Sequence, residues 1–116
     1  ATLGIPDLVA VAERRGLVVA HFPLSHGEAP SSPAAASPIV ERACEDALEG
    51  LRVVFVARSL GGRASMFAAG TLVTLGFSAE DAFATLAREL GKYAFEREEQ
   101  RSFVRRYAQW AVDQRR

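Results

Sequence analysis

The chain has 116 residues, a length that fits one domain spanning 1–116. Its 14 basic and 14 acidic residues cancel, which removes the electrostatic basis for general nucleic-acid binding. No apolar run approaches the length of a membrane span, and the single cysteine, Cys44, excludes an intramolecular disulfide or a cysteine-based metal cluster. We therefore expect a cytoplasmic domain without membrane contact, nucleic-acid partner, metal site or cofactor.

The first half of the chain predicts two helices and two short strands. Pro6 stands at a first helical position, and the helix it opens should end near Arg15. Residues 17–24 (LVVAHFPL) are typical of a buried strand that leads into a loop over 26–38, rich in Gly, Pro, Ser and Ala. A helix from Pro38 to about Glu49 should follow, and then a second buried strand over 52–56 (RVVFV).

The second half predicts a glycine-bearing turn and three helices. The turn covers 57–63, and a small, apolar segment over 64–75 is typical of a buried helix. Ser78 begins a sequence that resembles a capping box, so the next helix should run from there to about Leu90. A last helix is expected over 97–113, with Phe103, Val104, Tyr107 and Trp110 or Ala111 facing the core.

The order strand, helix, strand predicts a parallel pair with a right-handed crossover. We therefore expect an α/β fold in which a small parallel sheet is flanked by helices. Two strands alone make a poor sheet, so N-terminal strands should be missing or supplied by a second copy or another partner. The chain also begins with alanine rather than methionine, which indicates a domain that is incomplete at its N-terminus.

The turn over 57–63 has the composition of an anion site. A helix N-terminus presents backbone N–H groups and a partial positive charge, and glycines let these groups converge on an oxyanion. Arg63 can add a bidentate clamp on phosphate oxygens. The expected phosphate-binding residues are Arg58, Ser59, Leu60, Gly61, Gly62, Arg63 and Ser65.

This turn, between an apolar run and a helix, resembles the signature loop of the dual-specificity and tyrosine protein phosphatase superfamily. In that family a His-Cys pair is followed by five residues, Arg, and Ser or Thr. The similarity extends to segments 3–8 and 16–23, which resemble the branch related to cyclin-dependent kinase inhibitor 3, and to segments 72–82 and 96–107. The resemblance implies a phosphatase-like α/β fold and a phosphate-containing ligand, either a phosphoprotein or a small molecule.

The departures from the family pattern are equally specific. With Arg63 on the signature arginine, Ala57 takes the position of the nucleophilic cysteine and Val56 that of the preceding histidine. Leu60 replaces a glycine, and Ala64 replaces the Ser or Thr. A methyl group can neither act as a thiolate nor protonate a leaving group, so Ala57 predicts a catalytically inactive, phosphatase-like binding domain.

The loop that should carry the general acid of the family has no aspartate. It reads Ser25-His26-Gly27-Glu28, so His26 or Glu28 is the residue at the acid position. Two alternatives stay open: an active phosphatase whose cysteine was exchanged for Ala57, and an interaction domain with no anion site. The several independent departures favour natural loss of activity over a single exchange.

Other chemically active residues have simpler interpretations. Cys44 lies on the apolar stripe of its helix and should be a buried, inert thiol. Ser59 and Ser65 lack a recognisable base and are not expected to replace the nucleophile. His21 alternates with apolar residues and is expected to be structural.

Overall fold

The structure is a computed structural model of the chain, and it describes residues 14, 24, 29–51, 53–55, 62–91, 94–95 and 97–114. Of these residues 76% are helical. Within the longer described ranges the helices are α2 (Pro33–Leu48), α3 (Arg63–Thr74), α4 (Ala79–Leu90) and α5 (Glu98–Gln114). The helix expected over 6–15 and the strand expected over 17–24 lie outside the described residues, apart from Arg14, which is helical, and Leu24, which is not in a strand.

The helix α2 begins five residues before the position expected from the sequence. Ser32 is its N-cap, and the Oγ of Ser32 accepts a hydrogen bond of 3.2 Å from the backbone N–H of Ala35. Pro33 at the first helical position and the alanines behind it favour a helix, so the predicted loop ends at Ser32 and not at Pro38. Pro38 lies inside the helix on its exposed side.

The other three helices confirm the sequence analysis to within a residue or so. Gly76, with φ of 114°, follows the end of α3 in a backbone conformation that favours glycine. Ser78 caps α4, and its Oγ accepts a hydrogen bond of 3.1 Å from the N–H of Asp81. The helix α5 ends at Gln114, and its Phe103, Val104, Tyr107 and Ala111 are buried, as expected.

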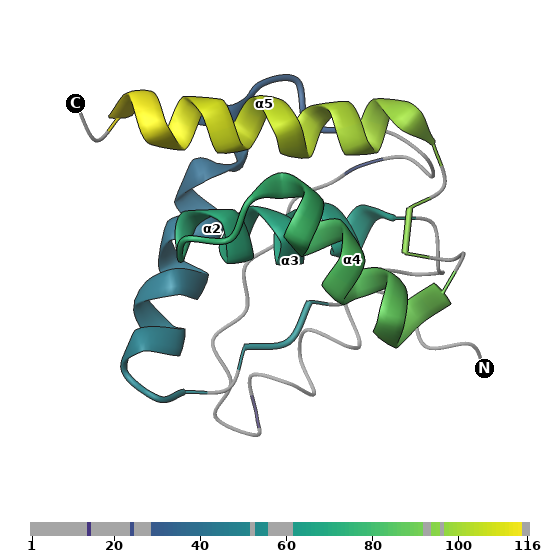
Figure 1. The fold of residues 1–116 in the computed structure, drawn as a ribbon. Coiled ribbons are helices and arrows are strands. Elements are labelled where there is room, and N and C mark those ends of the chain that lie inside the picture. Colours follow the sequence, from purple (N-terminus) through teal and green to yellow (C-terminus); the bar gives the residue numbers. More distant parts are fainter. Residues whose placement is uncertain are drawn as a thin grey trace.

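The buried helix α3 is the centre of the described structure. It contacts α2, α4 and α5, and α5 also contacts α2 and α4, whereas α2 and α4 do not touch. Figure 1 shows α5 running across the other helices. Gly70 lets α2 and α5 approach α3 closely, since a Cβ there would lie 3.3 Å from Val40 Cγ2 and 3.8 Å from Tyr107 Cδ1. The core members shared by these helices include Ala36, Val40, Cys44, Met66, Phe67, Val73, Ala82, Phe103, Val104 and Tyr107.

The expected α/β fold with its small parallel sheet is wrong for the part of the chain that the structure describes. No described residue is in a strand, and helices pack directly on helices. In the predicted second strand, residues 53–55 are neither helix nor strand, and the side chain of Val54 is 78% exposed. A central strand needs hydrogen-bonding partners and two covered faces. Here Val54 is exposed, whereas Val53 and Phe55 are partly buried, so only one side of this run is covered. The prediction that further strands are missing at the N-terminus or supplied by a partner rested on this sheet, so it loses its basis.

Candidate functional site

The glycine turn meets α3 at Gly62, the N-cap residue of that helix. Gly62 is buried and has φ of 87°, a left-handed conformation that favours glycine. Its carbonyl accepts a hydrogen bond of 2.9 Å from the N–H of Met66, which begins the helix. Ala57, at the nucleophile position, lies outside the described residues. The same holds for the predicted phosphate-binding residues before Gly62, which are Arg58, Ser59, Leu60 and Gly61.

Gln100 supports the turn from α5. This side chain has 0% exposure, although it is polar, and its amide lies against the α-carbon of Gly62, where a Cβ would collide with Oε1, Cδ and Nε2. The Oε1 of Gln100 also accepts a hydrogen bond of 3.2 Å from the N–H of Arg97, just before α5. One buried amide therefore contacts both the start of α3 and the start of α5.

Arg63 is the first residue of α3, and its side chain is partly buried. Its Nη1 donates a hydrogen bond of 3.2 Å to the backbone carbonyl of Leu24. Leu24 comes directly before the segment in which the resemblance puts the acid loop. The hydrogen bond therefore brings the beginning of that segment to the N-terminus of α3, across 39 positions in the sequence. His26 and Glu28 themselves lie outside the described residues.

The first turn of α3 has the electrostatics of an anion site. It contains no acidic residue, and its N-cap residue, Gly62, has no side chain that could accept hydrogen bonds from the first N–H groups. The partial positive charge of the helix end is thus not compensated by a neighbouring carboxylate of this turn. Ser65 is in this turn and is buried, which leaves its hydroxyl little room to act as a replacement nucleophile.

Cys44 is far in sequence from this turn, and it contacts the C-terminal turn of α3. Its thiol is buried, and Sγ lies 3.7 Å from the carbonyl oxygen of Thr71, to which it donates. This confirms the sequence prediction that Cys44 is buried in the core. It is not a displaced nucleophile of the glycine turn.

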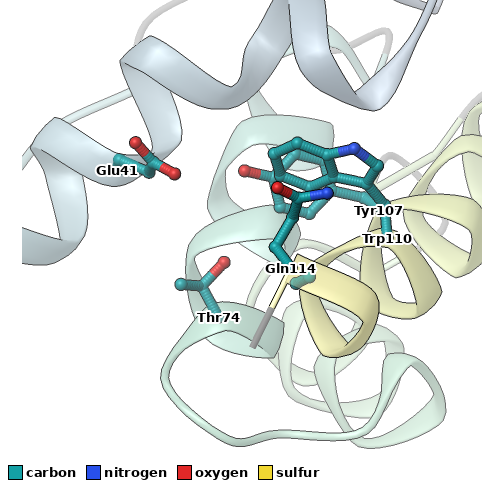
Figure 2. A pocket seen from close by; sticks show the side chains of 6 residues that line it. Glu41, Thr74, Tyr107, Trp110 and Gln114 are labelled. Atoms are coloured by element: carbon teal, nitrogen blue, oxygen red, sulfur yellow. The ribbon is translucent and has the colours of Figure 1, made fainter. Parts of the chain in front are cut away.

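A cavity of about 240 Å³ lies at the other end of α3 (Figure 2). Three helices line it through Glu41, Thr74, Tyr107, Trp110, Ala111 and Gln114. Burial, followed by the negative charge of Glu41, raises the pKa of Tyr107 to about 12, while hydrogen bonds with Ser37 and Thr74 act in the opposite direction. The sequence analysis predicts Tyr107 and Trp110 as core residues; Tyr107 is 1% exposed, whereas Trp110 is only partly buried.

Other classes of site find no support within the described residues. No group of three or more His, Cys, Asp or Glu side chains in this part of the chain could hold a metal ion. None of the helices in the described ranges has the length and apolar character needed to cross a membrane. Comparison with protein-family models, with curated proteins and with solved structures gave no match to the chain.

Neither the role of Gln100 nor the cavity at Glu41 was predicted from the sequence. Gln100 had a visible signal, because it precedes Phe103, Val104 and Tyr107 at the helical spacing i, i+3, i+4 and i+7. A polar residue at a core position of an amphipathic helix needs a hydrogen-bonding partner. Gln100 has one in the N–H of Arg97, before α5, and it also packs against Gly62 at the start of α3. The cavity had no such signal, since it depends on how the ends of α3 and α5 meet α2.

Proposed function

We propose that the chain binds a phosphate-like oxyanion at the N-terminus of α3 and does not hydrolyse phosphomonoesters. The hydrogen bond between Arg63 and the carbonyl of Leu24 is the main support for this function. It joins the helix start, which follows the glycine turn, to the segment that takes the position of the acid loop. The sequence predicts phosphate-binding residues in the first of these regions and the residue at the acid position in the second.

The Arg63–Leu24 contact is compatible with anion binding. A guanidinium has five N–H donors in a fixed plane, and a backbone carbonyl that accepts from one of them also fixes the direction of that plane. Holding the plane in advance reduces the side-chain entropy that anion binding would cost. The N-terminus of α3, whose first turn has no acidic residue, adds a partial positive charge next to Arg63.

Gln100 contributes by keeping Gly62 in place. The first N–H groups of α3 can converge on an anion only if the chain enters the helix through the left-handed conformation of Gly62. The buried amide of Gln100 packs against this glycine and leaves no room for a side chain. The ligand class, a free phosphate or a phosphorylated protein, rests on the resemblance of the turn to the phosphatase signature.

The absence of turnover follows from the side chains that the chemistry would need. Ala57 has no nucleophilic atom, and the loop after Leu24 has no aspartate to protonate a leaving oxygen. Anion binding requires neither group, since backbone N–H donors and Arg63 are sufficient. We therefore propose that the chain shares the phosphate-binding turn of the phosphatase superfamily without its catalytic activity.

Isothermal titration with inorganic phosphate tests the proposal. We expect saturable binding to the unmodified chain, and at least tenfold weaker binding to Arg63→Ala, because a charge-assisted bidentate contact is lost. Arg88→Ala is the matched control, since it removes the same charge from an exposed position on α4. Equal binding to the Arg63 and Arg88 variants, or no binding to the unmodified chain, would favour an interaction domain without an anion site. Circular dichroism checks that each variant keeps its helices.

A further inference from the structure

The cavity at the C-terminal end of α3 is small. At about 240 Å³ it lies below the range of roughly 300–1,000 Å³ found for sites of drug-sized ligands and cofactors. It can hold one small group, such as the end of a single side chain or a compact ion. The three helices that line it are α2, α3 and α5, so its shape is set by the helical core and not by a loop.

The charges around the cavity are negative. Figure 2 shows the carboxylate of Glu41 directed toward the space that Thr74 and Tyr107 also border. No ion pair joins Glu41 to another residue in the part of the chain that the structure describes. The carboxylate therefore has no protein counterion among those residues.

Two helix ends add to this negative charge. Thr74 is the last residue of α3 and Gln114 is the last residue of α5, and both line the cavity. The C-terminus of a helix has a partial charge of about −0.5, which favours cations. Neither helix has a basic residue in its last turn to neutralise it.

One wall of the cavity is aromatic. The rings of Tyr107 and Trp110 have their centroids 5.4 Å apart with an interplanar angle of 47°. Tyr107 is almost fully buried, whereas Trp110 is partly exposed, so the indole is the ring that a ligand can reach. Indole is the best aromatic partner for a cation, because its face carries negative charge.

We propose that this cavity binds a single alkylammonium cation, with Glu41 as the counterion and Trp110 as the aromatic wall. The carboxylate, the two helix ends and the indole all select for positive charge, and the volume limits the ligand to one cationic group. Such a group can come from a free quaternary ammonium compound, such as choline, or from a methylated lysine side chain of a partner protein. The proposal is independent of the oxyanion site, since α3 separates the two by its length of roughly 17 Å.

Trp110 is the only tryptophan of the chain, so its fluorescence reports on this cavity alone. We expect choline chloride to change the Trp110 emission in a saturable way, and sodium chloride at the same ionic strength to leave it unchanged. Glu41→Gln should weaken choline binding by about two- to fivefold, because it removes the exposed counterion and keeps the side-chain shape. Glu89→Gln is the matched control, since it makes the same charge change on α4, which does not touch α2.

Equal choline affinity in the two glutamine variants would overturn the proposal. A second arm compares choline with a short peptide that contains trimethyllysine. Tighter binding of the peptide identifies a protein partner as the source of the cation, and equal or weaker binding identifies a free quaternary ammonium compound.

Two arginines, Arg115 and Arg116, follow α5 directly in the sequence and lie outside the described residues. They could compete with a cationic ligand, so the titration is repeated with Arg115→Gln and Arg116→Gln combined. We expect the affinity for choline to be equal or higher in this variant. Absence of binding both in the unmodified chain and in this variant would contradict the proposed site, whatever the result of the phosphate titration.

Discussion

The side-chain amide of Gln100 packs directly against the α-carbon of Gly62, so that residue 62 cannot carry a Cβ without displacing this amide. Gly62 is also in the left-handed region, with φ of 87°. The contact connects the N-terminus of α3, where we propose an oxyanion site, to the start of α5. It explains why a fully buried glutamine is present in an otherwise apolar stripe of α5.

We predict that Gly62→Ala lowers the free energy of unfolding by about 3 kcal/mol, through left-handed strain plus overpacking against Gln100. Gly50→Ala is the matched control, because Gly50 has nearly the same φ, 84°, and no other atom lies within 4 Å of the place that its Cβ would take. That control should cost only about 1 kcal/mol. Urea denaturation of both variants measures the difference.

A double substitution isolates the contribution of the contact. In a Gln100→Ala background the amide is absent, so Gly62→Ala should cost no more than Gly50→Ala does in the unmodified chain. If Gly62→Ala and Gly50→Ala were equally destabilising in the unmodified chain, the packing of Gln100 against Gly62 would not hold in solution.

Pro38 gives a prediction of opposite sign. It lies inside α2 on the exposed side, so it cannot donate a hydrogen bond to the carbonyl of Ala34 and contributes little packing. We expect Pro38→Ala to raise the free energy of unfolding by about 1 kcal/mol or more, and with it the melting temperature. Pro33→Ala is the control, because a proline at the first helical position has no such cost. An unchanged or lower melting temperature for Pro38→Ala would argue that α2 begins at Pro38, as the sequence pattern indicates.

The sequence alone predicted the helices whose ends have local signals. Ser78 before α4 and Gly76 after α3 define their boundaries through capping and backbone conformation, and the apolar spacing in α5 defines its buried face. The start of α2 was predicted wrongly at Pro38, because a proline is common at the first position of a helix but can also be tolerated inside one. Short apolar runs such as 53–55 were ambiguous, since an apolar run of this length is compatible with a buried strand and also with a partly buried segment outside any sheet.

The part of the candidate site that depends on a local sequence pattern was predicted, and the part that depends on contacts distant in sequence was not. Arg63 after a glycine turn is a local pattern, and the structure describes it at the first position of α3. Its hydrogen bond to Leu24 and the contact of Gln100 with Gly62 join residues 39 and 38 positions apart, and no local pattern specifies such pairs. The cavity at Glu41 likewise depends on tertiary packing.

The raised pKa of Tyr107 predicts how stability depends on alkaline pH. In the folded chain the phenol keeps its proton up to about pH 12, because it is buried and close to Glu41, whereas in the unfolded chain it ionises near pH 10. Between these values the unfolded state alone loses the proton, so the free energy of unfolding should fall by about 2 kcal/mol as the pH rises from 10 to 12. Denaturation curves of the unmodified chain and of Tyr107→Phe measure this.

The comparison with Tyr107→Phe removes the effect of all other titrating groups. The variant should be less stable than the unmodified chain at pH 8, because it loses the hydrogen bonds of the hydroxyl with Ser37 and Thr74. The gap between the two proteins should shrink from pH 10 to 12. A constant gap over this range would show that the Tyr107 hydroxyl is not buried as described.

We predict that Ala57→Cys does not restore phosphatase activity. The returned cysteine would supply a thiol, but the His26–Glu28 loop has no aspartate, and Val56, Leu60 and Ala64 still depart from the family pattern. Hydrolysis of an aryl phosphate by this variant should not exceed that of the same variant carrying Arg63→Ala as well. Robust, Arg63-dependent turnover would instead favour an active phosphatase in which Ala57 replaced the catalytic cysteine.

The most direct test of the proposed oxyanion site is a phosphate titration followed by nuclear magnetic resonance of the backbone amides. We predict saturable shifts of the amide resonances of residues 62–65, at the start of α3, with much smaller shifts at the start of α4, which Ser78 already caps. Shifts spread evenly over the helix starts, or none at residues 62–65 at saturating phosphate, would contradict the account.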